Sequence, residues 1–288
     1  SVFDRHTHAD DEWHWFAAPL AFTSRQQGAG GYSQHGSGIL IGADKQTGGS
    51  DAGFFGGYLH DSASFRTGDG LRSKRDGGFI GAYFKQSKDR DNGPFTYGFV
   101  RYDNSKAKNR RALNINNAYL AEHKADFRQQ GGAAELGAGW NNSCGAGTLT
   151  WSAGLNYALT TQPAFQETGG ASAIGQTSEN YQSLLGSVGV QYATVMKPLN
   201  KQTDYQVSVG ARWQQELWRS DRNYKISLAG GSAPVHWESD ADKGWLELTL
   251  QGQLLHKKKL QVTAAAGTEL FRKDHRGVTG SLKLEYSF

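Results

Sequence analysis

The sequence has no long apolar run, and only 37% of its 288 residues are hydrophobic. A helix that spans a membrane needs about 20 consecutive, mostly apolar residues. The sequence therefore excludes a helical membrane protein. It does not exclude a membrane β-barrel, because a strand that crosses a bilayer needs apolar side chains only at alternate positions.

The sequence also has only one cysteine and a low net charge. The one cysteine, Cys144, can form neither an internal disulfide bond nor a cysteine-based zinc site. The formal net charge is only +4, and basic residues cluster in segments 66–75, 106–111 and 257–259, which we expect to be loops. Proteins that bind nucleic acid usually carry a basic stripe with interleaved aromatic residues. Such a stripe is absent from the sequence, so we expect no nucleic-acid partner.

Glycine and aromatic residues, in contrast, are abundant. The 38 glycines make up roughly 13% of the chain, nearly twice the usual share. The 8 Trp, 12 Tyr and 14 Phe exclude a disordered chain. Many glycines, many aromatic residues and a low mean hydropathy are together typical of a transmembrane β-barrel.

The sequence alternates with a period of two residues, and helical periodicity is nearly absent. In segment 149–157 the odd positions are Leu, Trp, Ala, Leu and Tyr, whereas the even positions are Thr, Ser, Gly and Asn. Segments 205–213, 260–270 and 282–288 follow the same scheme. The pattern indicates strands with two chemically different faces.

The position of the glycines favours a barrel with its apolar face outside. Gly137, Gly154, Gly189, Gly210 and Gly267 all fall on the polar face of their strands. Glycine weakens a strand that faces water, whereas small residues inside a closed barrel leave room for a lumen or a plug. We therefore expect an all-β fold, a transmembrane antiparallel barrel whose apolar side chains meet lipid.

We predict twelve strands, and the connections between them alternate in length. The predicted strands are 15–23, 38–45, 53–61, 78–86, 95–103, 130–140, 148–159, 184–193, 205–217, 245–256, 260–271 and 279–288. Connections at one rim are long, as in 104–129, and those at the other are short, as in 257–259; 272–278 is a short exception on the long side. Long outer loops and tight periplasmic turns are typical of outer-membrane barrels.

Aromatic residues near the predicted strand ends suggest girdles at the two membrane surfaces. The residues concerned are Trp13, Trp15, Trp140, Trp213, Trp218, Trp245, Tyr157, Tyr192 and Tyr286.

Several segments, taken in order, resemble a known family, the C-terminal translocator domain of monomeric autotransporters (type V secretion). They are 36–44, ending in Gly-x-Asp, 78–84, 98–104, the Glu-x-Gly strand 135–140, and the run 155–157 followed by 165–169. Trp140 stands where the family usually has Tyr. The resemblance covers about residues 13–288.

The resemblance implies what the chain does and with what it works. It implies a barrel at 13–288, integral to a bacterial outer membrane, that helps to export and anchor an N-terminal passenger without a cofactor or nucleotide. Residues 1–12 would be a residual linker or pore segment. Its partners would be outer-membrane lipid, the barrel-assembly machinery and its own passenger, with the barrel itself a monomer. The chain begins at Ser1 rather than Met, and we expect a processed or excised piece of a longer protein.

Two sets of residues are candidates for these roles. Leu282, Leu284, Tyr286 and Phe288 form a terminal alternating series that resembles the assembly signal of outer-membrane proteins, read by strand addition. The candidate pore-lining residues are Glu135, Asn156, Arg212, Glu216, Glu247, Glu269, Lys283 and Glu285.

Other functions remain open at this stage. His6, His8, Asp10, Asp11 and His14 form a cluster with metal-ligand chemistry, although a solvated linker is the simpler interpretation. We assign no metal, cofactor or catalytic residue.

A barrel enzyme is the main alternative, because His35 with Ser37, and His60 with Ser62, have the spacing of phospholipase-like or protease-like pairs. Neither pair has an Asn about a dozen residues later to orient it. A small substrate-selective porin is the remaining alternative.

Overall fold

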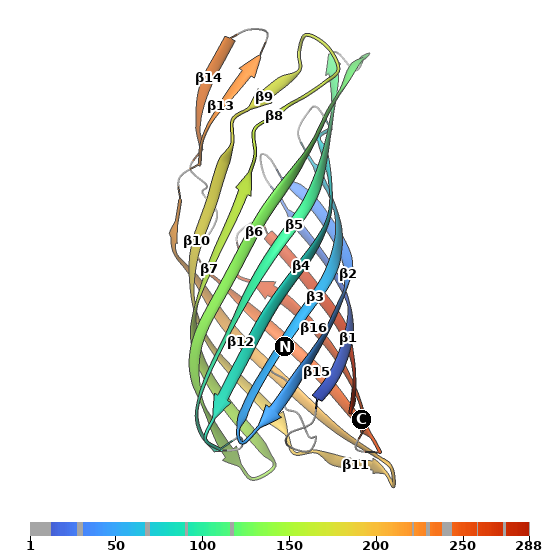
Figure 1. Ribbon diagram of the computed structural model, residues 1–288, viewed down its shortest axis with the longest axis vertical. Helices are drawn as coiled ribbons and strands as arrows, with labels where there is room; N and C mark the ends of the chain where they lie inside the picture. Colours follow the sequence, from blue (N-terminus) through green and yellow to red (C-terminus); the bar gives the residue numbers. More distant parts are fainter. Residues whose placement is uncertain are drawn as a thin grey trace.

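The computed structural model describes residues 13–27, 31–66, 70–89, 92–115, 118–220, 222–228, 231–237, 244–257, 259–272 and 275–287. These residues form seventeen strands (Figure 1): β1 (Trp13–Gln26), β2 (Tyr32–Thr47), β3 (Ser50–Phe65), β4 (Arg72–Ser87), β5 (Gly93–Ile115), β6 (Ala118–Cys144), β7 (Gly147–Gln162), β8 (Phe165–Gln166), β9 (Ile174–Gln176), β10 (Glu179–Thr194), β11 (Lys197–Asn200), β12 (Thr203–Arg219), β13 (Arg222–Leu228), β14 (Gly231–Trp237), β15 (Gly244–His256), β16 (Leu260–Leu270) and β17 (His275–Ser287). No helix in these ranges is long and apolar enough to cross a membrane.

Twelve of the strands form a closed antiparallel barrel. The order around the wall is β10, β7, β6, β5, β4, β3, β2, β1, β17, β16, β15 and β12, and β10 pairs with β12 to complete the circle. The first and last barrel strands meet at a seam, where His14 of β1 lies opposite Ser287 of β17. The predicted class, strand number and antiparallel pairing are confirmed.

The two faces of the wall differ as predicted. Leu136, Trp151 and Leu155 are 65%, 52% and 52% exposed on the outside, whereas their chain neighbours Glu135 and Ser152 line an inner cavity. Because side chains alternate across a strand, one face carries apolar groups to the outside and the other carries polar groups to the lumen.

The strands are longer than predicted at one end, and segment 104–129, expected to be a loop, is a strand pair. β5 continues to Ile115 and β6 starts at Ala118, and both rise above the wall at the top of Figure 1. The outward positions of this extension are polar because they lie beyond the apolar band. A search for apolar alternation therefore ends the strands too early.

Two further predictions need correction. The expected long connections 160–183 and 218–244 contain a second, four-stranded sheet in the order β14, β13, β9, β8 (Figure 1). Trp245, assigned to a lipid-facing girdle, is only 9% exposed and lies inside, where the Arg272 guanidinium covers its ring at 4.6 Å from the centroid. At a strand end the chemistry of an indole ring does not reveal which face it occupies.

The lumen is packed with aromatic side chains on the side formed by β1 to β5. Phe16, Phe55 and Tyr83 form a buried cluster, joined by Phe79 and Phe99. The barrel core is therefore a lining on one side of the lumen, and polar residues occupy the opposite side.

The β5–β6 extension packs its inner face against the segment after β7. The Phe127 ring stacks on Phe165 of β8, with centroids 4.8 Å apart and planes 11° apart. Arg111 donates a hydrogen bond of 2.7 Å to Glu167, and both side chains are largely buried. These contacts hold the extension in a fixed orientation at the upper rim.

Candidate functional site

A cavity of about 400 Å³ lies inside the barrel and is lined by residues of β4 to β7, β10, β12 and β15. Arg212 of β12 and Glu135 of β6 form an ion pair beside it, with Nη2 and Oε1 2.5 Å apart. The same Nη2 donates to the Ser187 hydroxyl at 2.7 Å, and the Asn156 amide donates to Glu135 at 3.4 Å. Three of the predicted pore-lining residues therefore form one network from three strands.

The other predicted pore-lining residues do not belong to this network. Glu247 lines the same cavity and accepts a hydrogen bond of 2.9 Å from Gln214. Glu216 forms an ion pair with Arg219, three residues along the chain.

The last three predicted residues, Glu269, Lys283 and Glu285, lie nearer the rims. Glu269 is 3.1 Å from Arg272 and 3.3 Å from His275 near the upper rim. Lys283 pairs with Glu285 at 2.9 Å near the seam. That the whole set lines a conduit stays a prediction.

Aromatic rings occupy the space that inward-facing glycines leave, which the sequence analysis missed. A Cβ at Gly137 would lie 2.3 Å from the Tyr97 ring, and one at Gly81 would lie 2.4 Å from the Phe55 ring. In both pairs the ring reaches across from an adjacent strand. Glycine on the polar face therefore accommodates a neighbouring ring at these positions, rather than open lumen.

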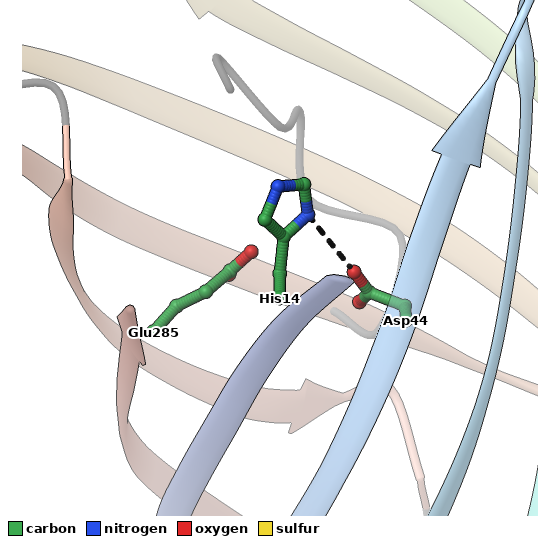
Figure 2. A group of neighbouring side chains, drawn as sticks. All are labelled: His14, Asp44 and Glu285. Carbon is green, nitrogen blue, oxygen red and sulfur yellow. Dashed lines mark ion pairs between the residues drawn. The ribbon is translucent and has the colours of Figure 1, made fainter. Parts of the chain in front are cut away.

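A buried polar cluster closes the seam near the lower rim (Figure 2). His14 of β1 lies between Asp44 of β2 and Glu285 of β17, and all three side chains are at most 1% exposed. Each offers one potential ligand atom, and these atoms lie within 4.8 Å of one another. The His14 Nδ1 is 3.4 Å from Asp44 Oδ1.

The carboxylates of this seam cluster have further partners: the Tyr83 hydroxyl donates to Asp44, and the Lys283 ammonium contacts Glu285. The cluster could hold a divalent metal with one nitrogen and two oxygen ligands. As it stands, it is a fully packed group that joins the first, second and last strands. His14 and Glu285 are separate candidates in the sequence, but their meeting with Asp44 could not be predicted, because the three residues are far apart in the chain.

Of the metal-like cluster suggested near the start of the sequence, only His14 lies within the described residues. His14 belongs to the seam cluster, and His6, His8, Asp10 and Asp11 lie outside the described residues.

The two His/Ser pairs lie side by side on the outer face of β2 and β3. Ser37 is opposite His60, and His35 is opposite Ser62. The His60 ring is 2.5 Å from Asp76 of β4, to which the Tyr58 hydroxyl also donates at 3.2 Å. The hydrogen bond with His60 is the main reason that the pKa of Asp76 lies below its ordinary value.

A closed antiparallel barrel with an apolar outer surface and a polar inner cavity defines a transmembrane β-barrel of the outer-membrane type. Comparison with family models narrows the class. The chain belongs to the autotransporter β-domain family, whose model matches residues 15–267. None of the curated proteins matches the sequence.

Solved structures agree on the fold. The chain is similar to the translocator domain of the autotransporter NalP from Neisseria meningitidis, with 17% identity, a TM-score of 0.74, and 98% of this chain and 91% of that chain covered. It is also similar to the β-domain of the Bordetella autotransporter BrkA, with 19% identity, a TM-score of 0.71, and 96% of this chain and 100% of that chain covered. A third similar structure is the transport unit of the autotransporter AIDA-I from Escherichia coli, with 13% identity, a TM-score of 0.63, and 100% of this chain and 94% of that chain covered.

Proposed function

We propose that the chain is the outer-membrane translocator barrel of a type V secretion system, which assists export of an N-terminal passenger and anchors it at the surface. The observation that carries this proposal is a closed wall that separates an apolar exterior from a polar cavity, in a member of the autotransporter β-domain family. The polar wall offers an extended polypeptide hydrogen-bond partners, and the aromatic wall offers it apolar contact.

The barrel has a definite orientation in this proposal. The rim with tight turns, such as 48–49 and 145–146, faces the periplasm, and β1 begins and β17 ends at that rim. The rim with the β5–β6 extension and the second sheet faces the outside. A passenger that enters from the periplasmic side joins the chain ahead of β1.

Assembly and oligomeric state follow from the same wall. Leu282, Leu284 and Tyr286 all project outward from β17 and are 42% to 43% exposed, which suits recognition of the strand by the assembly machinery. Phe288, the last member of the series, lies outside the described residues.

Each of the twelve described barrel strands pairs on both sides, so no open sheet edge favours association, and the barrel acts as a monomer.

The export role is tested by narrowing the cavity. Thr249 lines the cavity, whereas its neighbour Leu250 is 55% exposed on the outer face. With a reporter passenger fused ahead of the chain, we expect Thr249→Trp to reduce the protease-accessible passenger on intact cells. Leu250→Trp is the matched control and leaves passenger exposure unchanged. Equal exposure in both variants, with equal amounts of inserted barrel, would argue against passage through this lumen.

The barrel does not act as a hydrolase in this proposal, although Ser37, His60 and Asp76 lie in one row. An acyl-transfer site also needs N–H donors for the developing oxyanion. β2 pairs with β1 and β3 along the row, so its backbone donors are engaged in the wall. We expect no phospholipid hydrolysis by the purified barrel; hydrolysis that Ser37→Ala abolishes would overturn this assignment.

A further inference from the structure

A dense group of basic side chains projects outward from β4, β5 and β6, above the apolar band. We define the outer basic face as the outward-facing side chains of segments 72–76, 106–110 and 124–128. Seven of its nine positions are Lys or Arg and two are Asp. The sequence predicts loops for the basic segments 66–75 and 106–111, whereas most of these residues lie on paired strands.

Like charges lie directly opposite one another on this face. Lys74 of β4 pairs in register with Lys108 of β5, and Arg72 pairs with Arg110. Cross-strand neighbours on one face have Cβ atoms about 5 Å apart, and like charges at that separation destabilise a sheet.

The same arrangement continues across the next strand pair. Lys106 lies opposite Arg128, and Arg110 lies opposite Lys124. The outer basic face therefore contains four like-charge pairs over three strands. A surface of this kind is stabilised when an anion lies across it.

Carboxylates of the chain neutralise only part of this charge. Asp126 is 3.5 Å from Lys106, and Glu122 is 2.9 Å from Lys124. The hydrogen bond from Lys124 is the main reason that the pKa of Glu122 lies below its ordinary value.

Four of the basic residues form no ion pair of this kind, although Lys108 lies opposite Asp126 and its charge contributes to the lowered pKa of Asp76. Within the described part of the chain, Arg72, Lys74, Lys108 and Arg128 form no ion pair.

The strands hold these side chains on the outside. On the inner face of the same extension, Ala107, Ala125 and Phe127 are buried against Phe165. The extension therefore cannot turn its basic face inward without breaking this packing, and the charges are pre-organised for a ligand outside the barrel.

The height of the outer basic face corresponds to the headgroup region. Ile80, Val100 and Leu136 mark the apolar band, and Tyr58 and Tyr102 mark its upper border, where tyrosine is favoured. Lys106 follows Tyr102 by about 13 Å along the strand, or about 10 Å along the barrel axis at a tilt of about 40°. Tyr102 therefore lies at the edge of the hydrocarbon layer, and Lys106 lies in the polar headgroup layer above it.

We propose that the outer basic face binds the phosphorylated headgroup of a glycolipid in the outer leaflet, with the acyl chains against the apolar band of β4 to β6. This inference rests on the proposed function, which places this rim outside. Arginine can hold a phosphate with two parallel hydrogen bonds, and lysine adds point charge. Rows of like charge extend over about 13 Å along the strands, which suits a headgroup with more than one phosphate better than a single phosphodiester.

The test uses the full chain, folded in neutral detergent, and titrates it with diphosphoryl lipid A in the same micelles. We expect lipid A to bind and to raise the melting temperature of the barrel. Lys74→Gln/Lys108→Gln should weaken binding by at least about tenfold. Without lipid A this variant should melt at the same temperature or higher, because a like-charge pair has been removed. The control is Lys197→Gln/Lys201→Gln, which removes two exposed lysines at the opposite rim and should bind as the parent does.

Three results would overturn the inference: equal affinity in both double variants, equal affinity for lipid A stripped of its phosphates, or equal affinity for phosphatidylglycerol. The last result would assign the surface to anionic phospholipid in general. Failure of the proposed function is distinguishable, because a chain that is not a membrane barrel would not insert into phosphatidylcholine vesicles as a heat-modifiable, protease-resistant species. Insertion without a response to lipid A would reject this inference alone.

Discussion

At the scale of single residues, adjacent side chains of one strand meet different solvents. Leu155 of β7 is 52% exposed on the outer face, whereas its neighbour Asn156 hydrogen bonds Glu135 inside the barrel. The two positions have nearly the same backbone environment, so a comparison between them isolates the contribution of the surrounding solvent.

We expect Leu155→Lys to lower the free energy of unfolding by about 2–4 kcal/mol, because the ammonium group would have to enter hydrocarbon. Asn156→Lys should lower it less, since its side chain lies beside a carboxylate in a polar lumen. Urea titration of the barrel in lipid vesicles measures both values. Equal or reversed losses would mean that the two faces are assigned the wrong way round.

Glycine on the inner wall accommodates a ring rather than a change in backbone conformation. We expect Gly137→Ala to lower the free energy of unfolding by about 2 kcal/mol, because the added methyl group would overlap the Tyr97 ring. Gly78→Ala is the control, since a Cβ there would have its nearest contact at 3.6 Å. In a double-mutant cycle with Tyr97→Ala the losses should be less than additive; simple additivity would show that the ring does not constrain Gly137.

At the scale of elements, the strand count and the alternation could be predicted from the sequence, but the strand ends could not. The apolar pattern of β5 stops near Tyr102, yet the strand continues to Ile115 because Ala107 packs inside and the outward residues face water or headgroups. The sequence supplied eight candidate pore-lining residues, and its alternation predicts that they face inward. The sequence does not predict which of them meet in one network. Glu135 and Arg212, for example, form an ion pair only because β6 and β12, which are distant in the sequence, lie near each other in the closed barrel.

β17 is the element for which the terminal residue matters most. We expect deletion of Phe288 to reduce the amount of folded barrel in the outer membrane several-fold, because the assembly machinery would lose one member of the alternating apolar series. Heat-modifiability of the barrel in membrane fractions measures the effect. Deletion of Phe271, in the part of the connection after β16 that the structure describes, serves as a control for chain length. Full insertion of the Phe288-deleted chain would contradict the role of this series.

At the scale of the whole molecule, closure of the barrel joins the two ends of the wall through β1 and β17. The seam cluster of His14, Asp44 and Glu285 lies at this junction, near the lower rim (Figure 2). Two buried carboxylates on either side of one imidazole make the junction dependent on all three groups.

We expect His14→Leu to lower the free energy of unfolding by about 3 kcal/mol, because the two buried carboxylates of Asp44 and Glu285 would lose the imidazole that lies between them. Adding Glu285→Gln should recover part of the loss by removing one of the charges. Thr23→Leu, on the outer face of the same strand, is the control. A His14→Leu barrel as stable as the parent would show that the cluster does not hold the seam.

The sequence by itself determined the class of wall, because a period of two residues with glycine on the polar face is a local property of each strand. It also determined the number of barrel strands and, with the exception of Trp245, which of the named side chains face outward. Only the tertiary structure decided which distant residues meet: the rings above the glycines, the seam cluster, and the like charges opposite one another on the outer basic face. Those contacts depend on strand register and on closure of the barrel, which are set by the pairing of all twelve strands together rather than by any one segment.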